Sequence, residues 1–107
     1  METICIRIKI KQGALDDVRT WFQTLRERPN EVLQSLENEG VIIESVFLDS
    51  HGKDNYLIYY MKAENLSHAR GIASKSILPI DEYHRKCLKS LCEERYNLEQ
   101  LLDFDRI

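Results

Sequence analysis

Two neighbouring stretches of this chain are apolar without the regular alternation of a strand that has one wet face. They are Val41–Leu48 (VIIESVFL) and Tyr56–Met61 (YLIYYM). A strand with one solvated face alternates apolar and polar residues, whereas a strand covered on both faces need not. Whichever alternate set of this hairpin faces the protein's own helices, the other set is still largely apolar. The sequence therefore predicts a sheet with one face covered by helices and the other face covered by something else.

Length, composition and charge exclude several classes of protein. The 107 residues suit one domain spanning 1–107, and 43% hydrophobic with 31% charged residues is ordinary for a globular protein. The net charge of -3 gives no general attraction to nucleic acid or to anionic lipid. No apolar run approaches the roughly 20 residues that cross a membrane. We therefore expect neither a nucleic-acid partner nor a membrane partner.

The cysteines and the N-terminus indicate the compartment. The chain has three cysteines, an odd number, and none of them forms a C-x-x-C pair. The first residues lead directly into an alternating strand, without the basic start and apolar stretch of a signal peptide. We therefore expect reduced thiols and a cytoplasmic protein.

The first half of the chain has a clear order of elements. Isoleucine alternates with mainly basic residues from Ile4 to Lys11, as in a strand with one aliphatic face. A helical pattern from Leu15 to Leu25 follows, and Pro29 kinks it or starts a second helix that Gly40 ends.

The second half of the chain is predicted to begin with a β-hairpin, followed by two helices and a closing strand. Strands are predicted at Val41–Asp49 and Asn55–Lys62, followed by a short helix near 65–74. Pro79 suits the first turn of a further helix running to about Glu94. The apolar residues Leu98, Leu102 and Phe104 then suggest a closing strand.

The order β-α-β-β-α-β, with both helical segments split, is typical of a ferredoxin-like α+β fold. Right-handed crossovers give a four-stranded antiparallel sheet in the order 4-1-3-2, with all helices on one face. The isoleucines of the first strand should face the helices. On the opposite face, Arg7 and Lys9 should then lie beside Asp103 and Asp105 of the last strand.

A second copy of the chain is the simplest cover for the open face of such a sheet. Two sheets packed face to face would form a closed two-chain barrel with an isologous interface. The alternative is a monomer whose aromatic-rich sheet is partly shielded by Lys and Arg stems. We expect the homodimer, through the sheet face opposite the helices.

Four stretches of the sequence resemble an uncharacterised bacterial family of similar length: Glu2–Lys11, Val46–Asp49, Asp54–Ala63 and Leu102–Ile107. More broadly, the chain is similar to the dimeric α+β barrel superfamily of small ferredoxin-like proteins. That superfamily includes cofactor-less monooxygenases, lactone isomerases, haem-handling enzymes and proteins with no known reaction. None of their catalytic motifs matches this chain residue by residue. The resemblance therefore implies a fold and an assembly, but no catalytic residue and no activity.

The best polar cluster is Asp81-Glu82-Tyr83-His84, at the start of the last predicted helix. A histidine that titrates near neutrality can shuttle protons, and Asp81, three residues earlier, could orient its ring. The alternatives are a half-buried histidine satisfied by one hydrogen bond, or a histidine that binds a ligand.

Aromatic residues add further candidates. Tyr56, Tyr59 and Tyr60 place phenols on both faces of one strand, and Trp21 lies beside the apolar stripe of the first helix. Such side chains line many small-molecule pockets, although core or dimer-interface packing is the alternative. The candidates for ligand binding, taken together, are Trp21, Tyr60, Asp81, Tyr83 and His84.

Other chemistries find little support. The three histidines have no metal-ligand spacing, and no cofactor is expected. Cys87 is close to His84 on a helical face, but nothing marks its thiol as activated. The third strand lacks the glycine and the leading basic residue of an RNA-recognition strand. The hypothesis is a small-molecule-binding or cofactor-independent enzyme-like domain, and the alternative is a non-catalytic interaction or regulatory module.

Overall fold

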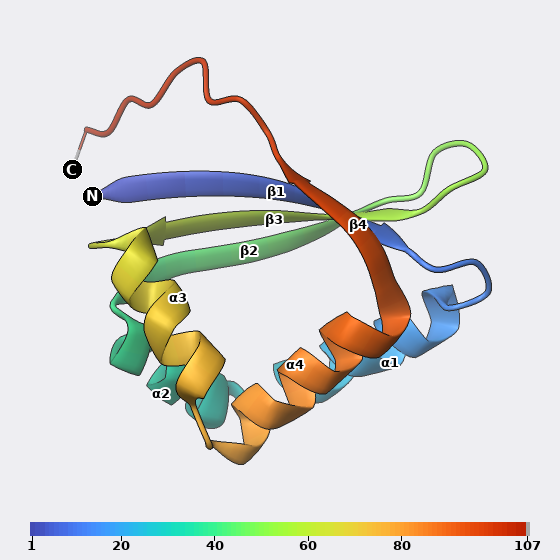
Figure 1. Cartoon of the computed structure of the whole chain (residues 1–107), viewed down its shortest axis with the longest axis horizontal. Coiled ribbons are helices and arrows are strands. Elements are labelled where there is room, and N and C mark those ends of the chain that lie inside the picture. Colours follow the sequence, from blue (N-terminus) through green and yellow to red (C-terminus); the bar gives the residue numbers. More distant parts are fainter. Residues whose placement is uncertain (107) are drawn as a thin grey trace.

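The computed structural model of the chain describes residues 1–106. Its elements follow the order expected for a ferredoxin-like fold with split helices (Figure 1). They are β1 (Glu2–Ile10), α1 (Leu15–Arg26), α2 (Pro29–Glu39), β2 (Val41–Asp49), β3 (Tyr56–Ala63), α3 (Leu66–Lys75), α4 (Pro79–Leu91) and β4 (Cys92–Asn97).

The four strands form one antiparallel sheet in the order β2-β3-β1-β4, which is the predicted order read from the other edge. All four helices lie on the same side of the sheet (Figure 1). The predicted fold class is therefore confirmed. Within residues 1–106, no helix is both long enough and apolar enough to span a bilayer.

The helix-facing side of the sheet holds the main apolar core. Ile6, Ile8 and Ile10 of β1 are buried there, as predicted, and Trp21 of α1 is only 1% exposed. The register pairs Ile6 with Tyr59 and so fixes which alternate residues of β3 face the helices. Because successive side chains of a strand point to opposite faces, Tyr60 must lie on the other side.

The opposite side, called the open face below, carries no helix. Phe47 of β2 is 63% exposed there, and Ile43 is 42% exposed. Arg7 covers part of this face, with its guanidinium 3.7 Å from the centre of the Tyr56 ring and 3.6 Å from the Asp49 carboxylate. Cation stems thus shield one end of the open face, whereas the apolar residues of β2 are left uncovered.

The predicted closing strand was placed wrongly along the chain. Helix α4 ends at Leu91 rather than near Glu94, and β4 is formed by Cys92–Asn97 instead of by the residues around Leu98–Phe104. Its charged sequence, CEERYN, gives no apolar alternation because the strand is at the edge of the sheet and mostly exposed. Charged side chains are common on such edge strands.

Residues 98–106, called the tail below, run along the open side of the sheet without forming a strand (Figure 1). The predicted pairing of Arg7 and Lys9 with the tail carboxylates is therefore wrong. Lys9 lies 3.9 Å from Asp54, and Asp105 forms an ion pair with Lys62. The tail carboxylates do lie over the open face, but at the other end of β1 and β3.

Gly40 ends α2 in a left-handed conformation, with φ at 73°, before the chain enters β2. A Cβ at this position would meet only ordinary contacts, since the nearest side-chain atom would lie 3.7 Å away. The left-handed backbone, and not space, is therefore what requires glycine.

We predict that Gly40→Ala lowers the free energy of unfolding by about 1 kcal/mol, because an L side chain is strained in that conformation. Gly71 is the matched control, since it lies within α3 with open space around it and no positive φ. Gly71→Ala should stabilise the protein by about 0.5–1 kcal/mol. Urea unfolding of both variants gives the comparison, and an equal effect of the two substitutions would contradict this account.

Candidate functional site

His84 of α4 is held by the buried indole of Trp21. The Trp21 Nε1–H donates to His84 Nδ1 over 3.2 Å, and the two ring centres are 5.2 Å apart. Because an indole nitrogen can only donate, Nδ1 must be unprotonated, and the neutral ring carries its proton on Nε2. Burial lowers the pKa of His84, and the opposing effect of Asp81 is smaller. The structure thus holds a neutral imidazole with an Nε2–H donor.

Tyr59 of β3 places a phenol beside this imidazole. Its ring centre is 6.2 Å from that of His84, and its side chain is buried. No residue in the described part of the chain forms a hydrogen bond with its hydroxyl. Burial raises the pKa of Tyr59 well above its ordinary value, so the phenol is protonated at neutral pH. A buried hydroxyl without a partner costs about 1–3 kcal/mol, which a bound molecule could recover.

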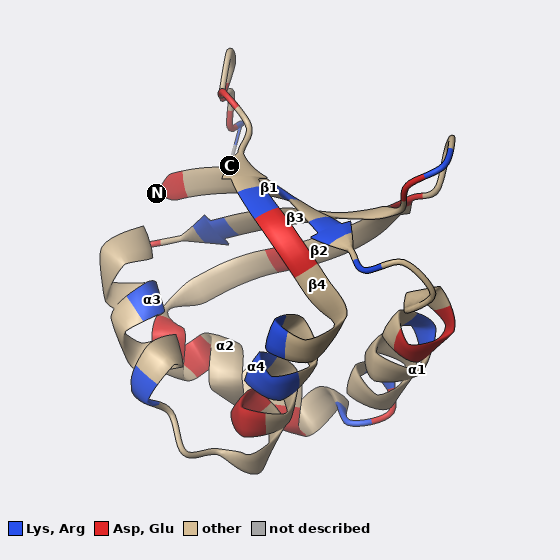
Figure 2. Cartoon of the chain, turned by 45° about the vertical axis from the view of Figure 1, so that its right-hand side comes forward, with Lys and Arg blue, Asp and Glu red and all other residues tan. Residues whose placement is uncertain are grey.

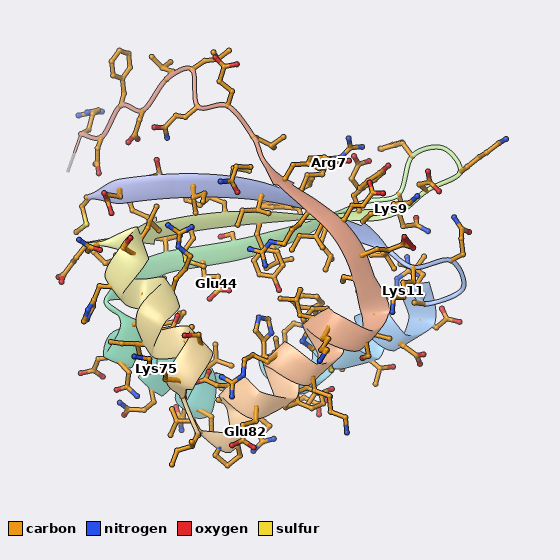
Figure 3. The ribbon with its side chains drawn as sticks, viewed as in Figure 1. Arg7, Lys9, Lys11, Glu44, Lys75 and Glu82 are labelled. Atoms are coloured by element: carbon orange, nitrogen blue, oxygen red, sulfur yellow. The ribbon has the colours of Figure 1, made fainter. Side chains whose placement is uncertain are left out.

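Glu44 of β2 adds a carboxyl group to the same side of the sheet. It pairs in register with Met61 and projects into the space between sheet and helices (Figure 3). Its pKa is raised to about 7, mainly by burial and in smaller part by the nearby carboxyl groups of Glu39 and Asp81. Within residues 1–106, its carboxyl group has neither a hydrogen bond nor an ion pair. Glu44 is therefore present in both protonation states near neutral pH.

Asp81 has a different role from the one expected. Its carboxylate accepts hydrogen bonds from Ser35 of α2, at 2.5 Å, and from Ser76, just before α4. It acts on the pKa of His84 only through its charge. Trp21, and not Asp81, orients the imidazole, while Asp81 joins α2 to the start of α4.

The other sequence candidates are distributed over both sides of the sheet. Trp21 and His84 lie together, whereas Tyr83 packs against the apolar core. Tyr60 lies on the open face, away from Trp21 and His84. Its neighbour Tyr59 lies beside His84 instead.

Sequence reasoning did not select Glu44. The only sign of it in the sequence is that Glu44 is an isolated carboxylate within the apolar run VIIESVFL. A charged side chain in such a strand faces either the helices or the open face of the sheet. The interior site consists of Glu44, Tyr59, His84 and Trp21, from four different elements.

This site has the composition of an acid–base centre rather than of a metal centre. Among the described residues, no three His, Cys, Asp or Glu side chains are arranged to hold a metal ion. Burial raises the pKa of the nearby Cys92 thiol to about 11, so its thiolate is scarce at neutral pH. What the arrangement offers is a carboxyl group that can exchange protons, together with two hydrogen-bond donors.

The chain belongs to a family of unknown function (DUF6176), which it matches over residues 1–107. No curated protein matches it in sequence.

Solved structures share its fold at low sequence identity. L-Rhamnose mutarotase from Formosa agariphila has a TM-score of 0.69 at 16% identity, over 98% of this chain and 100% of that one. A protein assigned to the antibiotic biosynthesis monooxygenases, from Nitrosomonas europaea, scores 0.61 at 10% identity, over 95% and 100%. An uncharacterised NIPSNAP-like domain protein from Burkholderia xenovorans scores 0.61 at 19% identity, over 96% and 89%. These likenesses show the fold alone.

The raised pKa of Glu44 predicts a specific pH dependence of stability. Between pH 4.5 and pH 7 the folded protein keeps a proton on Glu44 that the unfolded chain has lost. The free energy of unfolding should therefore fall as the pH rises through this range. Glu44→Gln, which cannot ionise, should gain about 2–3 kcal/mol relative to wild type across the same range.

Denaturant unfolding at several pH values measures this difference. Glu37→Gln, which removes an exposed carboxylate from α2, is the control and should follow the wild-type curve. Parallel curves for Glu44→Gln and wild type would show that Glu44 titrates as an ordinary carboxylate.

Proposed function

We propose that this protein binds a small polar molecule between its sheet and its helices and moves a proton on it without a cofactor. The observation that carries the proposal is the meeting of three groups that lack protein partners within residues 1–106. These are the Glu44 carboxyl group, the Tyr59 hydroxyl and the His84 Nε2–H. A buried hydroxyl normally has a hydrogen-bond partner, so the unpartnered Tyr59 hydroxyl, with the Glu44 carboxyl group and His84 on the same side of the sheet, suggests a ligand.

The chemistry follows from the states of these groups. A carboxyl group with a pKa of about 7 is half ionised at neutral pH, which is the best condition for a general acid–base catalyst. Glu44 would take a proton from a hydroxyl or an activated C–H of the substrate and return it to a different atom. Tyr59 and His84 would donate hydrogen bonds to the oxygen on which negative charge develops. No electrons are gained or lost, so the reaction class is isomerisation.

The mutarotase with the same fold suggests which substrates to test first. Mutarotation of an aldose removes a proton from the anomeric hydroxyl and adds one to the ring oxygen while the bond between that oxygen and the anomeric carbon breaks. The open aldehyde recloses on its other face by the reverse proton transfers, so the reaction belongs to this class. The low identity carries no residue role across, so aldoses are a starting panel for the proposal.

The predicted effect of Glu44→Gln is a fall in kcat of about 100-fold to 10,000-fold, because the amide cannot exchange protons. Tyr59→Phe should also lower kcat, by up to about 100-fold, through the loss of one donor. NMR exchange spectroscopy of the anomers of aldoses, L-rhamnose included, gives the rates.

Glu37→Gln, on the outer side of α2, is the matched control and should keep the full rate. His84→Gln offers a second check, because its amide oxygen can still accept from Trp21. The proposal fails if no small hydroxy or oxo compound is isomerised, or if Glu44→Gln retains the wild-type rate.

A second candidate function, assembly through the open face, is favoured by a separate observation. Exposed apolar residues lie both on β2 and on the tail, where Phe104 is 88% exposed and Leu101 is 85% exposed. The tail contacts Thr3 and Lys62 at one end of the open face without burying its own apolar side chains there. A second copy of the chain, in the cytoplasm, would cover both sets at once as a homodimer.

Sedimentation equilibrium tests this assembly, and a dimer should have twice the 12.6 kDa mass of one chain. Phe47→Glu should shift the mass to that of the monomer, because the charge would lie in the apolar interface. Leu33→Glu is the matched control. Leu33 is 61% exposed, against 63% for Phe47, but it belongs to α2, on the opposite side of the sheet from the open face. A wild-type protein that is monomeric at micromolar concentration would exclude the homodimer.

A further inference from the structure

A groove that is open to solvent, with a volume of about 400 Å³ and called the cavity below, lies between α4 and β4, outside the interior site. Its apolar wall comes from Ile8 of β1, Leu88 of α4 and Cys92 at the start of β4. A volume of this size accommodates a small organic molecule. The mainly apolar wall favours a ligand that has an apolar body.

The remaining wall of this cavity is basic. It carries Arg85, Lys89 and Arg95 against one carboxylate, Glu93, and so a formal charge of +2 in a chain whose net charge is -3. Figure 2 shows basic segments on α4 and a further one on β4, where it lies beyond the acidic stretch that follows α4. The local excess of positive charge favours an anion.

Within residues 1–106, none of these three cations forms an ion pair with a carboxylate. Arg85 donates to the backbone carbonyl oxygens of Ala73 and Ser76, at 2.6 and 2.7 Å, which orient the guanidinium without cancelling its charge. Lys89 and Arg95 have no carboxylate partner within residues 1–106. Charged groups of one sign, gathered around an apolar wall and left unpaired, are available to a ligand.

A second cavity, of about 310 Å³ beside the start of α4, shows the contrast. Its cation, Arg28, is already paired with Glu31 at 2.5 Å. The cavity between α4 and β4 is therefore the one that offers unpaired positive charge.

This basic cavity adjoins the interior site. Leu88 follows His84 by four residues on α4, so their side chains lie on the same helix face about one turn apart. Arg95 pairs in register with Ile8, on the helix-facing side of the sheet. Arg95 and Cys92 of the cavity wall both act electrostatically on Tyr59 of the interior site. The two places are therefore neighbours in the fold.

We infer that the cavity between α4 and β4 holds the anionic end of a small organic acid, whose apolar body lies against Ile8 and Leu88. Its polar far end then extends toward Tyr59 and His84. One helical turn, about 5 Å, separates His84 from Leu88 beside the apolar body, so the charged end of the ligand lies farther than this from the reacting end. This inference rests on the proposed function, and it names the substrate class of that site.

The test compares two probes that differ only in charge, 4-hydroxyphenylacetate and 4-hydroxyphenylacetamide. Both have an apolar ring and a far hydroxyl, but only the first is an anion. Titration calorimetry should give tighter binding of the acid. Arg95→Gln and Lys89→Gln should each weaken binding of the acid about threefold to fivefold, because these cations are exposed and screened by solvent, and should leave binding of the amide unchanged.

Lys86→Gln is the matched control, since Lys86 is an exposed lysine on the same helix but is outside the cavity wall. It should bind both probes as wild type does. Trp21 is the only tryptophan of the chain, so a change in its fluorescence on binding would show that the ligand reaches the interior site.

Glu44→Gln separates this inference from the proposed function. It should lower kcat about 100-fold to 10,000-fold yet still bind the acid, because Glu44 does not line the cavity. Equal binding of acid and amide, failure of both to bind at millimolar concentration, or insensitivity of the acid to both cation substitutions would overturn the inference. Loss of turnover in Glu44→Gln would still support proton transfer in each of those cases.

Discussion

The covering of only one face of the sheet is the constraint on which the rest of this structure depends. The two helical connections, α1 with α2 and α3 with α4, both lie on the same side of the sheet. Each strand side chain therefore faces either the helices or the open face. The register between β1 and β3 makes this choice, because it sets Ile6 opposite Tyr59. The same alternation brings Glu44 inside and Phe47 outside. The interior site and the uncovered apolar surface are therefore two results of one geometric choice.

The sequence was sufficient for the topology and insufficient for the faces of the hairpin. Alternation in β1 was strict enough to orient its isoleucines correctly. In β3, however, Tyr59 and Tyr60 are chemically alike, so no pattern could tell which one faces the helices. Only pairing with a distant strand settles that choice, and it separates Tyr60 from His84.

The prediction of the closing strand was wrong for a different physical reason. An edge strand that is mostly exposed needs few apolar residues, so CEERYN has the charge pattern of a helix end, while the apolar tail has the pattern of a strand. Trp21 and His84 were recognised as candidates, but the hydrogen bond between them joins residues 63 positions apart. Glu44 was missed because one carboxylate in an apolar run has no local signal for the direction in which it points.

Another consequence follows from the course of the tail. Leu98 N donates to Cys5 O, and Asp103 accepts from Thr3, so the last described residues return beside the start of β1. Figure 1 shows the start of β1 and the tail on the same side of the molecule. A purification tag or fluorescent protein fused at either end would thus begin next to the open face rather than next to the helices. The choice of fusion end therefore offers no way to keep such an addition away from that face.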